Sequence, residues 1–156
     1  MEASQSRAPE RAAHRDADRA QNVRVVHQGD DRFDVVVRGH RITVDQPEEA
    51  GGHDTAPTPT ELFLSALASC VGFYARRFLA RHRLPEHVVV DCRWWMEKAP
   101  SRVGAIEVAV AVPYLPQNQL DRFQKAIEHC SVHNTMKRPP QVSITTSRTD
   151  AGSEVA

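Results

Sequence analysis

The sequence predicts an α+β fold in which antiparallel sheets pack on two long core helices. Short stretches where apolar and polar residues alternate are typical of half-exposed strands. Two longer stretches carry apolar residues three and four positions apart, which is typical of amphipathic helices. The order strands, long helix, strands, helix, strand is typical of an antiparallel sheet against which helices pack.

The first strands are expected between residues 23 and 45. Apolar residues alternate with polar ones over 23–25 and 33–37, and the turn-like residues 28–31 separate them, so we expect a hairpin. A third strand is predicted over 40–45. Residues 46–59 carry three prolines, two adjacent glycines and several acids, and we expect a loop there. Connections of this length are often functional.

A long helix is predicted from Pro59 to about Arg81. Thr58 can act as the N-cap, Pro59 suits the first helical position, and Glu61 completes a capping box. Apolar residues at spacings of three and four then form a broad face. Pro85 is expected to end the helix.

The remaining elements follow in the second half of the chain. Strands are predicted over 88–96 and 105–112, around a turn near 101–104, and a final strand over 141–146. A second helical region is expected to start after Pro116 and to stop before a pair of prolines. Its apolar stripe consists of Leu120, Phe123, Ile127 and Cys130.

Length and charge exclude several classes of protein. The 156 residues carry 20 basic and 20 acidic side chains, whereas nucleic-acid and anionic-membrane binders need excess positive charge. The longest charge-free apolar stretch, 62–75, is 14 residues long, and about 18 to 20 are needed to span a bilayer. With no apolar segment typical of a signal peptide, we expect a cytoplasmic protein that contacts neither nucleic acid nor membrane.

The domain organisation is also predicted. Residues 1–21 contain no Val, Ile, Leu or Phe and have little to bury, so we expect a disordered or weakly ordered tail. Residues 22–150 are expected to form a single domain.

Three cysteines make an odd count, which argues against a disulfide scaffold. Cys70 and Cys130 each lie on the apolar stripe of a predicted helix, so their thiols would meet if the helices pack on one another. Buried cysteines also commonly serve as small apolar residues, and the sequence leaves both interpretations open. Cys92, within a predicted strand, is better explained as a core residue.

Two segments resemble motifs of the OsmC/Ohr family. Residues 58–70, TPTELFLSALASC, are similar to the family helix with its P-x-E-L-h-h-x-A-h-x-x-C type signature. Residues 130–136, CSVHNTM, resemble the second motif, in which a cysteine precedes P-V-x-N-x-L-like residues. Residues 51–54, GGHD, resemble a loop found in many relatives. The resemblance covers roughly residues 23–147.

The resemblance implies an intertwined homodimer and a thiol-dependent peroxidase that reduces organic hydroperoxides in the oxidative stress response. Cys70 would be the peroxidatic residue and Cys130 the resolving residue, which condenses with it to a disulfide. A dithiol reductant such as a lipoyl group would reset the pair. The family needs neither a metal nor an organic cofactor.

The reactive species is the thiolate, whereas an ordinary thiol has a pKa near 8.5. Cys70 lies well past the first turn, where the helix dipole acts, so it needs another source of stabilisation. Family peroxidases supply an arginine held by a glutamate near the start of this helix. The glutamate position matches Thr60, one residue before Glu61, so Glu61 is either catalytic or only a cap. Arg32 is our candidate for the arginine; Arg24, Arg38 and Arg41 are alternatives.

Three further side chains are candidates for substrate binding. Phe63 and Phe73 are core residues by default, and with His133 they are our candidates to line an apolar pocket for an alkyl hydroperoxide. His133 can also hydrogen-bond near Cys130 or cap a turn. The Cys-x-x-His spacing of Cys130 and His133, with the nearby His129, occurs in zinc sites. The other ligands would have to come from elsewhere, so we expect no metal.

An OsmC-fold dimer without efficient peroxidase activity is the alternative. It would bind a small apolar ligand, and its cysteines would be inert core residues. The offset of Glu61 and the unassigned arginine favour this alternative, whereas two cysteines within recognisable motifs favour an enzyme. The sequence therefore predicts a cysteine-based organic hydroperoxide reductase.

Overall fold

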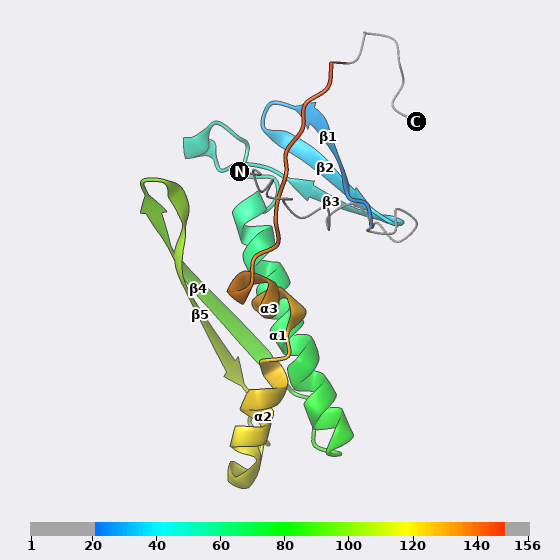
Figure 1. Ribbon diagram of the computed structural model, residues 1–156, viewed down its shortest axis with the longest axis vertical. Helices are drawn as coiled ribbons and strands as arrows, with labels where there is room; N and C mark the ends of the chain where they lie inside the picture. The colour runs from blue at the N-terminus through cyan, green and yellow to red at the C-terminus, as the bar shows by residue number, and fades with distance from the viewer. Residues whose placement is uncertain (1–20, 149–156) are drawn as a thin grey trace, which may run out of the picture. The chain divides into compact units, whose positions relative to one another are not determined.

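The computed structural model describes residues 21–148 and places them in two compact units, which divide between Glu61 and Leu62 (Figure 1). The expected weakly ordered tail over 1–21 lies, except for its last residue, outside the described residues. The single domain expected over 22–150 remains a prediction.

The first unit contains a three-stranded antiparallel sheet in the order β1-β2-β3. Its strands are β1 (Arg24–Gly29), β2 (Arg32–Val37) and β3 (His40–Val44), as the alternating pattern predicts. The two turns use residues with positive φ, 49° at Asp30 and 55° at Arg38. Aspartate is one of the residues that tolerates this conformation, which suits Asp30 to the turn between β1 and β2.

Asp45 anchors the predicted loop that follows β3. It is 1% exposed, and its carboxylate accepts hydrogen bonds from the Gln46 N–H (2.8 Å), the Thr55 N–H (3.0 Å) and the Thr55 hydroxyl (2.6 Å). The loop contains one short 3-10 turn, η2 (Glu48–Ala50). A Cβ at Gly52 would overlap the backbone of Gln46, so this close approach requires glycine.

Helix α1 (Pro59–Arg81) begins in the first unit and continues through the second. The capping box is confirmed: the Glu61 N–H donates to the Thr58 hydroxyl (3.2 Å), and the Thr58 N–H donates to the Glu61 carboxylate (2.7 Å). The helix is long and apolar enough, by length and composition alone, to cross a membrane. A third of that stretch is buried, and five of the six buried residues of α1 belong to the core of the second unit.

Strands β4 (Val89–Lys98) and β5 (Ser101–Ala111) form an antiparallel hairpin. The turn predicted near 101–104 is wrong, because β5 already starts at Ser101 and the chain reverses at residues 99–100. Gly104 lies instead in a β-bulge, where the register shifts opposite Trp95 and Met96. A Cβ there would meet the exposed Glu97 side chain, which would have to turn aside.

The second helical region is divided, which corrects the expectation of two long helices. Helix α2 (Leu120–Ile127) follows the short turn η3 (Gln117–Gln119), and three residues separate α2 from helix α3 (Ser131–Lys137). Cys130 lies between them with φ −52° and ψ 119°, outside the helical region. The α+β class with antiparallel sheets is confirmed.

The final strand predicted over 141–146 is wrong for the described part of the chain, where residues 141–148 form no strand. Val142 is 75% exposed and Ile144 is 89% exposed. An alternating sequence becomes a strand only when another strand supplies its hydrogen bonds, and none is paired with it among the described residues.

The core of the second unit lies between α1, α2 and the β4–β5 hairpin. Phe78 of α1 meets Phe123 of α2 edge to face, with ring centroids 5.4 Å apart. Ile127 and the fully buried Cys130 complete this cluster, and apolar residues of both strands pack against it. Burial of these faces holds the two cysteine-bearing segments together.

Candidate thiol site

The structure brings Cys70 and Cys130 together within the second unit. Cys70 is half-buried on α1, Cys130 is fully buried at the start of α3, and both thiols are free. The two thiols are close enough for each to shift the pKa of the other. The Cys70 Sγ lies 3.7 Å from the Oγ of Ser131, the next residue after Cys130.

Local hydrogen bonds explain why Cys130 is held at this point. Its N–H donates to the Ile127 carbonyl at the end of α2 (3.2 Å), and its carbonyl accepts from Asn134 in α3 (2.9 Å). Its Sγ accepts from the His133 N–H (3.4 Å) and so acts as the N-cap of α3. The break between the helices therefore presents Cys130 and the first turn of α3 to Cys70.

The surroundings shift the pKa values of the two thiols in opposite directions. Burial raises the pKa of Cys70, but hydrogen bonds from Cys130, the Val132 N–H and the Ser131 hydroxyl and N–H outweigh it, so the net pKa is lowered. Burial raises the pKa of Cys130, and the neighbouring Cys70 raises it further. Titratable groups whose pKa values are pushed apart are suited to different roles, and here Cys70 is the more acidic thiol.

Cys92 is a useful internal comparison. It lies on β4, is also half-buried, and burial alone raises its pKa. Partial burial without hydrogen-bond donors therefore raises the pKa of Cys92, whereas the donors around Cys70 lower its pKa.

Arg32 and Glu61 belong to the first unit. Arg32 lines a hollow of about 320 Å³ together with Asp34, and the alternative Arg41 forms an ion pair with that aspartate. The Glu61 carboxylate accepts from both the N–H and the hydroxyl of Thr58, as a helix cap does. The catalytic roles expected for Arg32 and Glu61 stay predictions.

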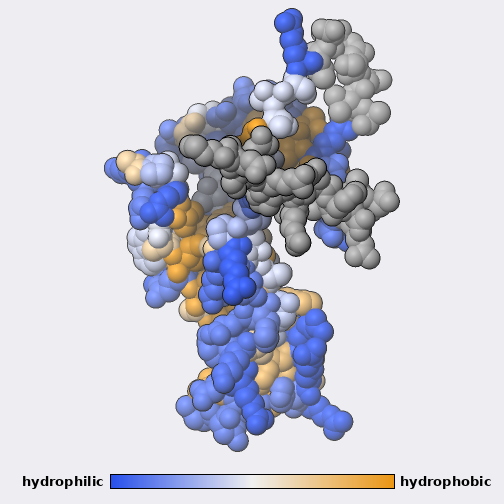
Figure 2. Space-filling view, in the orientation of Figure 1, coloured by the Kyte–Doolittle hydropathy of each residue, from blue (hydrophilic) through white to orange (hydrophobic). Residues whose placement is uncertain are grey.

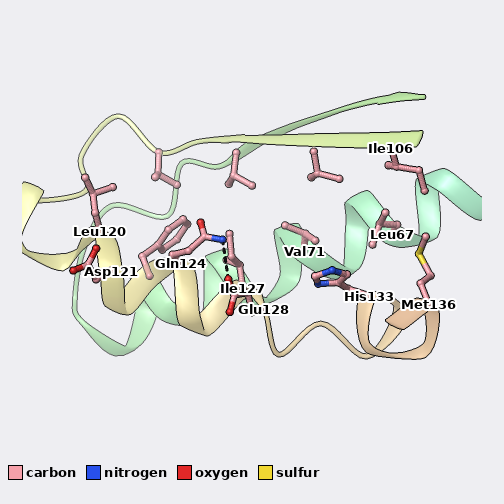
Figure 3. A pocket seen from close by; sticks show the side chains of 14 residues that line it. Leu67, Val71, Ile106, Leu120, Asp121, Gln124, Ile127, Glu128, His133 and Met136 are labelled. Atoms are coloured by element: carbon pink, nitrogen blue, oxygen red, sulfur yellow. Dashed lines mark hydrogen bonds between the residues drawn. The ribbon is translucent and has the colours of Figure 1, made fainter. Parts of the chain in front are cut away.

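A cavity of about 690 Å³ lies in the second unit, between β5 and the three helices (Figure 3). His133 and Met136 of α3 point into it, close to Leu67 and Val71 of α1. Its other walls are mainly apolar side chains of β5 and α2, and apolar surface is visible alongside the hairpin in Figure 2. Since the N–H of His133 donates to the Cys130 Sγ, the cavity adjoins the thiol pair.

Of the three residues expected to contact substrate, only His133 lines this cavity. Phe73 lines a separate hollow that contains Ser69 and Gly72, and the Arg77 guanidinium lies over its ring at 5.3 Å. Phe63 is 44% exposed and lines neither space. Their expected role as substrate contacts has no support in the cavity and stays a prediction.

The sequence pattern did not predict two features of the site. No local pattern marks Ser131 as a donor, because its partner Cys70 lies 61 positions earlier in the chain. The apolar residues of β5 that line the cavity are Ile106, Val108 and Val110, and Val112, directly after the strand, continues the row. Their strict alternation identifies one continuous face of a strand and was a usable signal for a cavity wall.

The histidines near Cys130 do not gather around one point. Among residues 21–148, no group of three or more His, Cys, Asp or Glu side chains is arranged to hold an ion. His129 lines a different hollow, with Tyr74 and His82, from the one into which His133 points.

The family comparison agrees with the two motifs. Residues 52–145 match the model of the OsmC-like protein family, and this range contains both cysteines of the pair. The chain belongs to the OsmC-like protein family, whose members are soluble proteins. No curated protein sequence matches the chain.

Solved structures show the same fold. A protein from Psychrobacter arcticus, described provisionally as an osmotic stress induced and detoxification response protein, is 22% identical with a TM-score of 0.67, covering 72% of this chain and 85% of its own. The organic hydroperoxide resistance protein OsmC from Legionella pneumophila is 19% identical, with a TM-score of 0.54 and coverage of 76% and 89%.

A third similar structure is an organic hydroperoxide resistance protein from Elizabethkingia anophelis, crystallised with bound thiocyanate. It is 13% identical, with a TM-score of 0.59, and the match covers 77% of this chain and 91% of that one. At these identities the likeness establishes the fold.

Proposed function

We propose that this protein is a thiol-dependent peroxidase that reduces organic hydroperoxides through Cys70 and Cys130. The observation that carries the proposal is geometric: the half-buried Cys70 of α1 packs against the fully buried Cys130 at the start of α3. The lowered pKa of Cys70 and the raised pKa of Cys130 agree with it. Membership of the OsmC-like family supports it, as do the names of the Legionella and Elizabethkingia proteins.

The proposed reaction has three steps. The Cys70 thiolate attacks the hydroperoxide O–O bond, one oxygen stays on sulfur as a sulfenic acid, and the other leaves as the alcohol after taking up a proton. The Cys130 thiol then condenses with the sulfenic acid to give a disulfide and water. An external dithiol, such as a lipoyl group, reduces the disulfide by exchange and is itself oxidised to a disulfide.

Each cysteine suits its step for a physical reason. The half-buried Cys70 is open to a substrate, and its donors favour the nucleophilic thiolate. Cys130 stays protonated, because a buried anion beside the Cys70 thiolate is unfavourable, so it is spared from direct oxidation. It lies next to the sulfur that it must resolve.

We further propose that the protein acts in the cytoplasm as a homodimer. The support for a dimer is the unpaired segment 141–148, with Val142 and Ile144 exposed, and the exposed Trp95 of β4 (55%). Exposed alternating apolar residues are typical of a strand that pairs with another chain. Arg32 is proposed to add positive charge near the thiolate in the assembled protein, with Glu61 holding it.

The test is mass spectrometry of free thiols after one equivalent of cumene hydroperoxide, with hydrogen peroxide in parallel. Wild type is expected to form a Cys70–Cys130 disulfide faster with the organic oxidant. Cys130→Ser should stop at the Cys70 sulfenic acid, Cys70→Ser should not react, and the matched control Cys92→Ser should behave as wild type. Survival of both thiols in excess oxidant would overturn the proposal.

A second candidate function, binding of a small apolar ligand without peroxidase activity, is favoured by the cavity of about 690 Å³. This volume and apolar lining are typical of sites for small molecules. Under this function, apolar compounds should raise the melting temperature of wild type but not of Val110→Trp, which fills the cavity. Reduction of hydroperoxides by Val110→Trp at the wild-type rate would show that the cavity is not the substrate site.

A further inference from the structure

Ser131 is fixed beside the Cys70 sulfur by the first turn of α3. Its carbonyl accepts a hydrogen bond from the Thr135 hydroxyl (2.8 Å), and its Oγ lies 3.7 Å from the Cys70 Sγ. This separation suits a hydrogen bond to sulfur, whose atomic radius is larger than that of oxygen. A thiolate has no proton to give, so in the reactive form the hydroxyl must be the donor.

Ser131 offers two donors to the sulfur, a backbone N–H and a hydroxyl, whereas a proline at this position would offer neither. Both are among the groups that lower the pKa of Cys70.

We infer that Ser131 is a catalytic residue of this chain, whose hydroxyl and N–H hold the Cys70 sulfur as a thiolate. The inference rests on the proposed peroxidase function and names a source of stabilisation other than a fixed cation. Among the described residues of the second unit, Cys130 is the titratable group facing Cys70, and no charged side chain hydrogen-bonds to its thiol. Ser131 and Val132, which α3 turns toward it, are uncharged.

The chemistry predicts how Ser131 acts. During attack the negative charge leaves the sulfur for the departing alkoxide oxygen, so a hydrogen bond to sulfur weakens as the reaction proceeds. Ser131 therefore increases the fraction of thiolate before attack more than it stabilises the transition state. Its loss should slow the reaction at neutral pH but leave the rate at high pH, where the thiolate is fully formed, nearly unchanged.

The test measures alkylation of each cysteine by iodoacetamide across pH in the reduced full-length protein, read by mass spectrometry. Ser131→Ala should shift the Cys70 profile to higher pH and slow its alkylation at neutral pH by about three- to tenfold. The plateau at high pH should stay. Ser131→Thr, which restores a hydroxyl, should recover most of the loss.

Two more variants sharpen the test. Ser131→Pro removes both donors and should shift the profile further than Ser131→Ala; proline suits the first position of a helix, so α3 should still form. Ser69→Ala is the matched control, because the Ser69 hydroxyl beside Cys70 donates to the Ala66 carbonyl of its own helix (3.2 Å). It should leave the profile unchanged.

Coinciding Cys70 profiles for Ser131→Ala and wild type, with both proteins folded by circular dichroism, would overturn the inference. A shift in the profile of Arg32→Gln with none in Ser131→Ala would also overturn it and assign the role to a cation. Because alkylation needs no hydroperoxide, the experiment can refute the role of Ser131 without refuting the peroxidase function, and the reverse. A protein that reduces no hydroperoxide but shows the Ser131 shift would refute the peroxidase and retain the thiolate donor.

Discussion

Asp45 in the first unit and Cys70 in the second are both acids whose pKa is lowered by nearby donors. Asp45 is 1% exposed, and hydrogen bonds from the Thr55 hydroxyl and N–H, only partly offset by burial, lower its pKa to about 2. Cys70 is half-buried, and its donors come from the start of α3. The same interaction therefore serves a sealed carboxylate in one unit and an accessible thiol in the other.

The comparison shows that exposure decides what a stabilised anion does. A carboxylate enclosed by three donors is charged at any ordinary pH and has no room for a reactant, so it fixes a loop. A thiol with one open side keeps its anion available for attack. Each site can therefore be changed while the other serves as the reference.

The largest effect is expected when each acid is removed. Asp45→Ala leaves buried donors without an acceptor and should lower the melting temperature by about 5 °C or more, with the Cys70 alkylation profile unchanged. Cys70→Ala should abolish hydroperoxide reduction while the melting temperature changes by much less. The exposed Glu49→Ala is the control for loss of a carboxylate, and equal losses of stability in Glu49→Ala and Asp45→Ala would contradict the anchoring role.

Acid should remove the contribution of Asp45. Its folded pKa of about 2 is below the ordinary 3.8, so its stabilisation is complete above pH 3.8 and is lost as the pH falls through about 2. The melting temperature of wild type should fall more steeply over this interval than that of Asp45→Asn. Parallel curves for the two proteins would show that Asp45 is not the responsible group.

A smaller difference is expected among the thiols themselves. Cys70 should alkylate with a midpoint below that of an ordinary thiol, because donors favour its anion, and Cys92 with a midpoint above it, because burial acts alone. Site-resolved mass spectrometry across pH measures both in one sample. If the order reverses, the role of the α3 donors is refuted.

The smallest effect concerns the start of α1. Thr58→Ala removes the N-cap hydroxyl that accepts the Glu61 N–H, and the free energy of unfolding should fall by about 1 kcal/mol. Urea denaturation measures the change. Thr58→Ser keeps the hydroxyl, and its free energy of unfolding should stay close to that of wild type. A decrease as large as that of Thr58→Ala would assign the stabilisation to the threonine methyl group instead.

Local signals predicted several elements well. The capping box marked the first turn of α1, and the turn residues between β1 and β2 marked the hairpin. The two cysteine motifs indicated the family and the candidate pair Cys70 and Cys130. Such signals are readable because the interactions that they encode join residues a few positions apart.

Other expectations failed where the partner is distant in sequence. Gly104 suggested a turn, but its place was decided by the register against Trp95 and Met96 across the hairpin. The stripe of Leu120, Phe123, Ile127 and Cys130 suggested one helix. Apolar residues can keep spacings of three and four across a one-turn interruption between two helices. The pattern therefore does not reveal that Cys130 caps the next helix.

The sequence by itself determined the α+β class, the long helix, the family and the two thiols. Only the tertiary structure decided which thiol is the more acidic, that Ser131 meets Cys70, and which expected substrate residues reach the cavity. The apolar pattern specifies which face of an element is buried. It does not specify which donors the folded chain then places around a given sulfur, and these donors set its chemistry.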